Sequence, residues 1–274
     1  MLRASVVSCV LLGMAGTLVI TDDATAQPAN LSAAEIVSKN IAARGGLAAW
    51  RGVQTLSWAG KLDAGGNNEP QFKIPGRPAP PRPSAELTAQ VQLPFVLEMA
   101  RARMSRWEIQ FAGQTAVQVY DGKQGWKVRP YLGRGGVEPF TADELKSAEA
   151  QADLDGALVD YAAKGTTVEL AGVEKVEGKD AYKLKLTLRD KRVMHEWIDA
   201  TSFLEVKLEG TPRKLDGKSH AVSVFLRDYR TVNGLVMPYL VETVVEGVQR
   251  TEKIQIEKVV VNPNLNASRF AKPT

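Results

Sequence analysis

The sequence offers few side chains that could act as acids, bases or nucleophiles. Its two histidines, His195 and His220, both fall in stretches of strand-like alternation, where a histidine is more often a surface or core residue than a general base. The sequence contains no G-x-S-x-G, H-E-x-x-H or C-x-x-C motif and no phosphate loop. It therefore predicts no catalytic residue, no metal ligand and no cofactor.

Carboxylates are plentiful but scattered along the chain. Glu98 and Glu108 could face each other on paired strands, which is the minimum that a glycosidase needs. Salt bridges to Arg101, Arg103 or Arg106 explain these carboxylates better, because no cleft lined by sugar-stacking aromatic residues is indicated. A secreted hydrolase is thus the least favoured function, and we expect a protein that is not an enzyme.

The first 26 residues have the pattern of a secretory signal peptide. Arg3 provides a positive start, an apolar run follows, and small residues lead up to Ala26. A membrane anchor is the alternative, but serine and glycine interrupt the run, which is shorter than the ~20 residues of a spanning helix. We expect cleavage near Ala26 and a mature chain located in the periplasm or secreted.

The only cysteine, Cys9, lies in this leader, so the mature chain has neither a disulfide nor a thiolate site. Residues 27–274 suit one large β domain or two small ones, and are enough for a core that needs no disulfide. Loss of the leader changes the formal charge from +4 to +5, since one arginine and two aspartates leave with it. Basic residues alternate with acidic ones and do not cluster, so nucleic acid is not an expected partner.

Two segments carry the signals of a helix start. Ser32 and Glu35 have the spacing of a capping box, and that helix should end at Gly45-Gly46. A second capping box, Thr141-Ala-Asp-Glu144, should open a helical insertion of about residues 141–164. Both helices are expected to pack against something larger.

Most of the remaining chain alternates apolar and polar residues with a period of two, which is typical of half-buried antiparallel strands. The alternation is clearest from Tyr182 to Arg189. About eleven strands follow one another with few helices between them, which excludes a parallel α/β fold. We therefore predict a mainly β, α+β fold, in which a curved antiparallel sheet forms an incomplete β-barrel covered by the helices.

A proline-rich segment, residues 63–84, interrupts the alternation after the first strand. It contains six prolines, which have no backbone N–H to donate to the hydrogen bonds of a sheet. Two interpretations stay open: a loop at the rim of a cavity, or a plain flexible insertion, which is favoured.

Four tracts of the mature chain resemble the outer-membrane lipoprotein-sorting family of LolA/LolB-like periplasmic carriers, in a divergent secreted branch. They are Ala34–Arg51, Tyr120–Trp126, Gly178–Lys185 and Asp228–Pro238. The resemblance implies one domain over residues 27–274, an unclosed β-barrel with a helical lid, and a hydrophobic cavity for acyl chains. It also implies a chaperone-like role in lipoprotein transport, with lipoprotein or lipid cargo and inner- or outer-membrane envelope proteins as partners.

The first hypothesis is a periplasmic carrier or sensor that binds lipoprotein acyl chains or another amphipathic lipid and acts as a monomer. The alternative is an interaction or signalling module, in which the cleft or a strand edge docks another envelope protein. The side chains expected to line the cleft share one face of neighbouring strands, although each could instead belong to a filled core. They are Leu56, Trp58, Leu97, Met99, Trp107, Ile109 and Phe111, with Trp126 near the rim.

Overall fold

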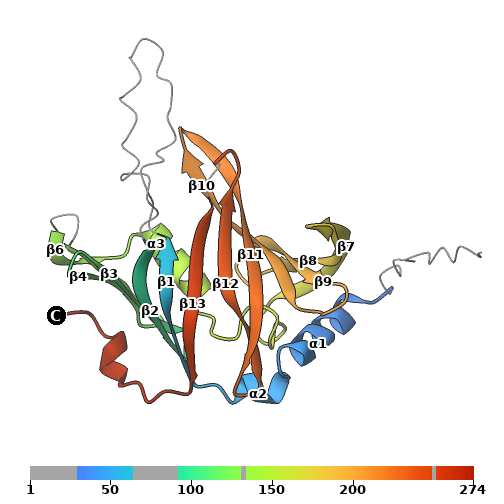
Figure 1. The fold of residues 1–274 in the computed structure, drawn as a ribbon, viewed down its shortest axis with the longest axis horizontal. Helices are drawn as coiled ribbons and strands as arrows, with labels where there is room; N and C mark the ends of the chain where they lie inside the picture. The colour runs from blue at the N-terminus through green and yellow to red at the C-terminus, as the bar shows by residue number, and fades with distance from the viewer. Residues whose placement is uncertain (1–29, 64–91, 131–133, 249–250) are drawn as a thin grey trace, which may run out of the picture.

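A single antiparallel sheet dominates the fold (Figure 1), as seen in a computed structural model. The structure describes residues 30–63, 92–130, 134–248 and 251–274. The predicted signal peptide and all but the first residue of the proline-rich segment lie outside this part of the chain. The strands are β1 (Thr55–Asp63), β2 (Gln92–Ala100), β3 (Met104–Phe111), β4 (Gln114–Tyr120), β5 (Gly125–Arg129), β6 (Arg134–Pro139), β7 (Thr167–Val176), β8 (Lys179–Thr187), β9 (Val193–Asp199), β10 (Glu205–Leu215), β11 (Lys218–Val232), β12 (Leu235–Val245) and β13 (Glu252–Val261).

Two meanders make up this sheet. The strand order is β6-β5-β4-β3-β2-β1-β13-β12-β11-β10-β9-β8-β7, so neighbours in sequence are neighbours in space except where β1 pairs with β13. The sheet is strongly curved but not closed, with β6 and β7 at its two edges. The predicted incomplete barrel is therefore confirmed, and the described residues form thirteen strands where about eleven are predicted.

The helices are α1 (Ala33–Ala43), α2 (Leu47–Arg51), α3 (Ala142–Gln151) and the short 3-10 helix η3 (Ala267–Phe270). Of these, α1 and α3 begin where the capping boxes predict, whereas α2 follows Gly46 without a side-chain cap. Ser32 Oγ accepts from the Glu35 amide at 3.3 Å, and the Glu35 carboxylate accepts from the Ser32 amide at 2.8 Å. Thr141 and Glu144 make the same reciprocal pair at the start of α3.

The predicted helical insertion is shorter than expected, because α3 ends at Gln151. Turns occupy most of residues 153–165. Gly156 there has a φ of +79°, which a helix does not allow. Leu158 and Val159 nevertheless lie in the core, so this segment still covers the sheet.

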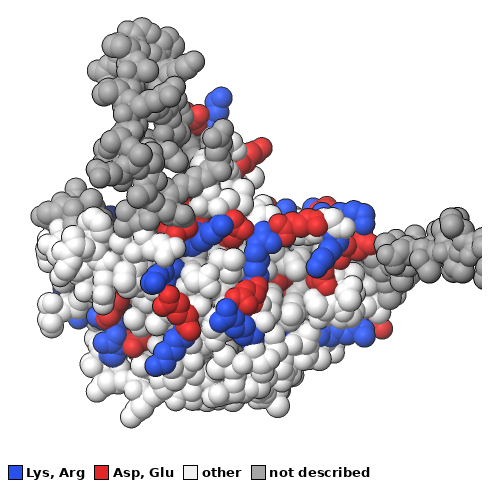
Figure 2. Space-filling view, in the orientation of Figure 1, with Lys and Arg blue, Asp and Glu red and all other residues white. Residues whose placement is uncertain are grey.

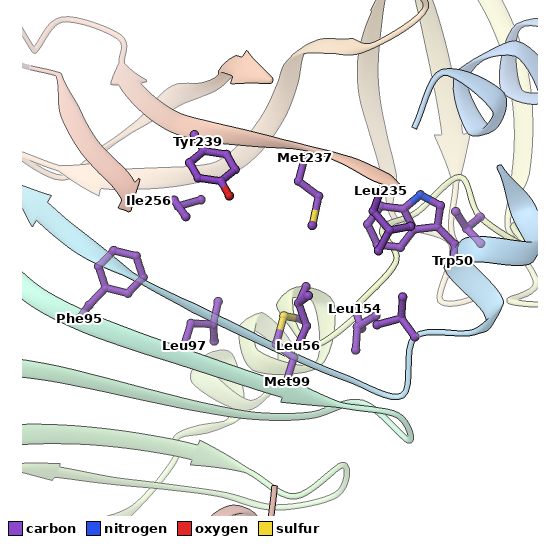
Figure 3. Packing of buried hydrophobic residues seen from close by; sticks show 12 residues of the cluster. Trp50, Leu56, Phe95, Leu97, Met99, Leu154, Leu235, Met237, Tyr239 and Ile256 are labelled. Carbon is purple, nitrogen blue, oxygen red and sulfur yellow. The ribbon is translucent and has the colours of Figure 1, made fainter. Parts of the chain in front are cut away.

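The core fills much of the space inside the curve. In Figure 3, side chains from β12 and β13 point across the fold toward those of β1 and β2, with Trp50 and Leu154 closing one end. A second cluster joins Ile36 and Val37 of α1 to Tyr182 and Leu184 of β8. The helices thus cover the concave face mainly over β7–β9 and at the end of the sheet where α2 packs.

Charged side chains of opposite sign are interleaved over the face shown in Figure 2. Pairs such as Lys183 with Glu174 and Lys185 with Glu169 join neighbouring strands at the surface. Within the described residues, none of the helices has the length and apolar character needed to cross a membrane.

Candidate ligand-binding cavity

Strands β1 to β4 place apolar side chains in rows across the concave face. The register pairs Trp58 with Leu97, Leu97 with Trp107, and Trp107 with Gln118. The row beside it joins Gly60, Phe95 and Ile109 in the same way. Because alternate residues of a strand point to the same face, these rows form one continuous apolar surface.

An apolar cavity of about 320 Å³ lies on this surface, at the end of the sheet where β1 stops and β2 starts. This volume is at the lower end of the ~300–1,000 Å³ typical of small-ligand sites. Trp107, Ile109 and Phe111 from β3 provide its centre, and Phe111 is 43% exposed. The other lining residues are Leu62, Leu93, Ala116, Gln118, Val128 and Arg129.

A second cavity, of about 250 Å³, lies next to the first and beneath α3. Trp107 and Gln118 line both cavities. Its lining is much more polar, because α3 contributes carboxylate, hydroxyl and amide groups. The remaining lining residues are Leu97, Ser105, Val119, Tyr120, Phe140, Asp143, Glu144, Ser147, Ala148 and Gln151.

The structure gathers only part of the predicted lining set around these cavities. Trp107, Ile109 and Phe111 line the apolar cavity, and Leu97 lines the cavity beneath α3. Leu56 and Met99 are buried in the core and line neither cavity.

Two predicted tryptophans take other positions. Trp58 packs beside the core, and its Nε1 is buried without a hydrogen-bond partner among the described residues. Trp126 pairs with Val119 and alternates along β5 with Lys127, which reaches α3 on the concave side. That any of these side chains contacts a ligand stays a prediction.

Two ion pairs fix the polar groups at the cavities. Arg129 donates to Glu138 at 2.7 Å, but the Arg129 Nε is buried without a partner among the described residues. Lys127 binds both carboxylate oxygens of Glu144 at 2.5 Å. Burial disfavours the charged Glu144, yet hydrogen bonds from Lys127 and Thr141 outweigh it and lower the Glu144 pKa.

A separate polar cluster lies beneath α1 and the turns that follow α3. Arg44 pairs with Glu205 at 3.1 Å and stacks on Trp50 at 4.4 Å. Glu196 lies nearby on β9, and burial together with the charge of Glu205 raises the pKa of Glu196 to about 8. In the sequence Glu196 is one strand carboxylate among several, and no local signal marks it as buried.

The buried Asp155 anchors the turns to the rest of the fold. It binds Arg101 at 2.5 Å and Lys164 at 2.6 Å. Arg101 also donates to the backbone oxygens of Trp50 and Val53, both at 2.8 Å. These ion pairs and hydrogen bonds connect the turns after α3 to the rest of the fold, so the cluster has a structural role.

The carboxylates considered for hydrolysis are held in ion pairs. Arg269 binds Glu98 at 2.5 Å and Glu108 at 3.0 Å, and Arg106 binds Glu108 at 2.6 Å. His195 contacts Glu209 at 2.6 Å, away from both cavities. These contacts match the salt-bridge interpretation, but of the three predicted arginines only Arg106 takes part. Arg101 and Arg103 pair with other carboxylates, and Arg269 is a partner that the sequence did not indicate.

Comparison with solved structures relates this fold to proteins of low sequence identity. A LolA superfamily protein from Nitrosomonas europaea has a TM-score of 0.55 and 13% identity, covering 88% of this chain and 98% of its own. A putative outer membrane lipoprotein-sorting protein domain from Vibrio parahaemolyticus has a TM-score of 0.54 and 11% identity, covering 87% and 95%. A DUF1329 family protein from Desulfovibrio piger has a TM-score of 0.56 and 11% identity, covering 87% and 97%.

No family model and no curated protein matches the sequence. The similarity therefore lies in the three-dimensional arrangement, over nearly the whole length of each neighbour. The resemblance noted in the sequence is confirmed at the level of fold, because the chain shares its fold with a LolA superfamily protein and a putative outer membrane lipoprotein-sorting protein domain.

Proposed function

We propose that this protein is a periplasmic carrier or sensor that binds the acyl chain of a lipoprotein, or of another amphipathic lipid, in the apolar cavity. The observation that carries the proposal is the open apolar wall of Trp107, Ile109 and Phe111 on the concave face. The names of two solved neighbours, a LolA superfamily protein and a lipoprotein-sorting domain, support it. The leader predicted in the first 26 residues supports export.

The chemistry of the cavity favours an acyl chain. Each methylene transferred from water into such a site gains about 0.8 kcal/mol, and the apolar wall is itself relieved of contact with water. Gln118 and Arg129 are the polar residues of this lining. An amphipathic molecule suits both the apolar wall and these polar side chains.

An interaction module that adds a strand at an edge of the sheet is less well supported. The edge strand β7 carries the surface ion pairs of Glu169, Glu174 and Lys175 with residues of β8. Charged side chains on an edge strand oppose pairing with a further strand. The cavity is therefore the feature on which the proposal rests.

A charge placed in the cavity wall tests the proposal. Phe111→Arg should weaken binding of a fluorescent fatty-acyl probe at least tenfold, because the acyl chain would then pack against a guanidinium. The matched control is Val193→Arg, since Val193 is 49% exposed on β9 and does not line either cavity. Equal binding by both variants, or no binding by the unmodified mature protein, contradicts the proposal.

A further inference from the structure

The cavity beneath α3 differs from its apolar neighbour in the groups that it presents. Ser105, Gln118, Ser147 and Gln151 bring hydroxyl and amide groups that can each donate and accept hydrogen bonds. Apolar side chains, with Trp107 among them, form much of the remaining wall, together with Tyr120, Asp143 and Glu144. Such a lining suits a small polar group that is attached to something apolar.

The charge of this cavity is negative. Asp143 and Glu144 are its charged lining residues. Lys127 neutralises Glu144, whereas Asp143 makes no ion pair with any residue that the structure describes. Among the described residues no arginine or lysine lines the cavity. Asp143 is exposed at the mouth of the cavity, in the first turn of α3. A phosphate placed here would lie near this carboxylate, and like charges repel.

The two cavities adjoin along β3, in an order that suits an amphiphile. Trp107 and Gln118 line both cavities, so the apolar and polar sites lie side by side. Along β3 the lining runs from Phe111 in the apolar cavity to Ser105 in the polar one. Six residues of a strand span ~20 Å, a length that accommodates an acyl chain together with its head group.

Resting on the proposed function, we propose that the cavity beneath α3 receives the head group of the bound amphiphile and selects an uncharged, hydroxyl-bearing head over a phosphate-bearing one. The tail lies over Trp107, Ile109 and Phe111, and the hydroxyl groups of the head bond to the serine and amide side chains beneath α3. Asp143 accepts a hydroxyl hydrogen bond and repels phosphate.

The test compares two probes that share one acyl chain and one glycerol unit, namely 1-oleoylglycerol and oleoyl lysophosphatidate. Each probe competes, below its aggregation concentration, with a fluorescent fatty-acyl probe bound to the mature protein. We expect 1-oleoylglycerol to bind at least tenfold more tightly. Equal binding, or tighter binding of the phosphate, overturns this inference and leaves the proposed function standing. Binding of neither probe overturns both.

Variants of α3 locate the selection. Asp143→Asn should tighten lysophosphatidate binding several-fold and change 1-oleoylglycerol binding little, so the preference shrinks. Glu149→Gln is the matched control, because Glu149 lies on the same helix, pairs with Arg103 and lines neither cavity. Circular dichroism checks that both variants keep their fold. An unchanged preference in Asp143→Asn overturns the assignment of the head group to this cavity.

Discussion

At the scale of single residues, Glu196 is the side chain whose environment departs furthest from that of an ordinary surface carboxylate. It is only 4% exposed on β9, and Glu205 lies close enough to oppose its ionisation. Burial and this like charge raise its pKa from 4.5 to about 8. At neutral pH the folded protein therefore holds a proton on Glu196.

This proton makes stability depend on pH. The unfolded chain loses it near pH 4.5, whereas the folded chain keeps it up to about pH 8, so the folded state binds more protons between these values. The stabilisation is complete at low pH and is lost as the pH rises toward 8. The glutamine of Glu196→Gln stays neutral at every pH, so this variant does not lose the stabilisation as the pH rises.

We expect the free energy of unfolding of Glu196→Gln, measured in urea, to exceed that of the unmodified protein by an amount that grows with pH, by about 1–4 kcal/mol between pH 5 and 8. Glu169→Gln is the control, because Glu169 is exposed on β7. Parallel stability curves for Glu196→Gln and the unmodified protein would show that Glu196 ionises normally.

Residue patterns predict the cavity only in part. Trp107, Ile109 and Phe111 alternate along one strand, so their common face can be read from the sequence. The contributions of Val128 and Arg129 depend on the register between β4 and β5, which alternation does not provide. Leu56 and Met99 share the same face but lie under the covering elements, and a period of two cannot separate a filled core from an open wall.

At the scale of elements, the two capped helices differ in how much they bury. Helix α1 places Ile36 and Val37 in the core, whereas α3 has no buried residue. The same capping substitution should therefore have different consequences in the two helices. Loss of a cap in α1 loosens packed core, but loss of a cap in α3 frays a surface helix.

Ser32→Ala should lower the free energy of unfolding by about 1 kcal/mol, the usual cost of losing an N-cap side chain. Thr141→Ala should leave global unfolding nearly unchanged and increase amide hydrogen exchange within α3. Urea unfolding and hydrogen exchange measured on both variants check this contrast. Equal loss of global stability in the two variants would mean that α3 belongs to the cooperative core.

The ends of elements show where local sequence signals suffice. Both capping boxes occur where their spacing predicts, because the interaction spans only three residues. No local signal marks strand β6, since its glycines are typical of a loop and it is a strand through its pairing with β5. Gly45 is a helix stop that the sequence shows, but its close approach to the Gly234 carbonyl, which leaves no room for a Cβ, is a tertiary contact.

At the scale of the whole molecule, the sheet is covered unevenly. Helix α1 packs on β7–β9, and the chain from α2 together with the turns after α3 closes one end of the core. Over β3–β5, α3 contributes no buried residue, and both cavities lie there. Alternation predicts a curved sheet with one apolar face, but the positions of the covering helices decide which part of that face stays open.

Quenching of tryptophan fluorescence by a brominated acyl chain tests the central claim, that the open apolar wall binds lipid. Bromine quenches only tryptophans close to it, and the chain has five. We predict saturable quenching that falls most in Trp107→Phe, because Trp107 lines both cavities. Trp197→Phe should leave the quenching unchanged, since Trp197 packs with Val176 and Ala181 in a cluster apart from the cavities. No saturable quenching, or undiminished quenching in Trp107→Phe, would contradict the account.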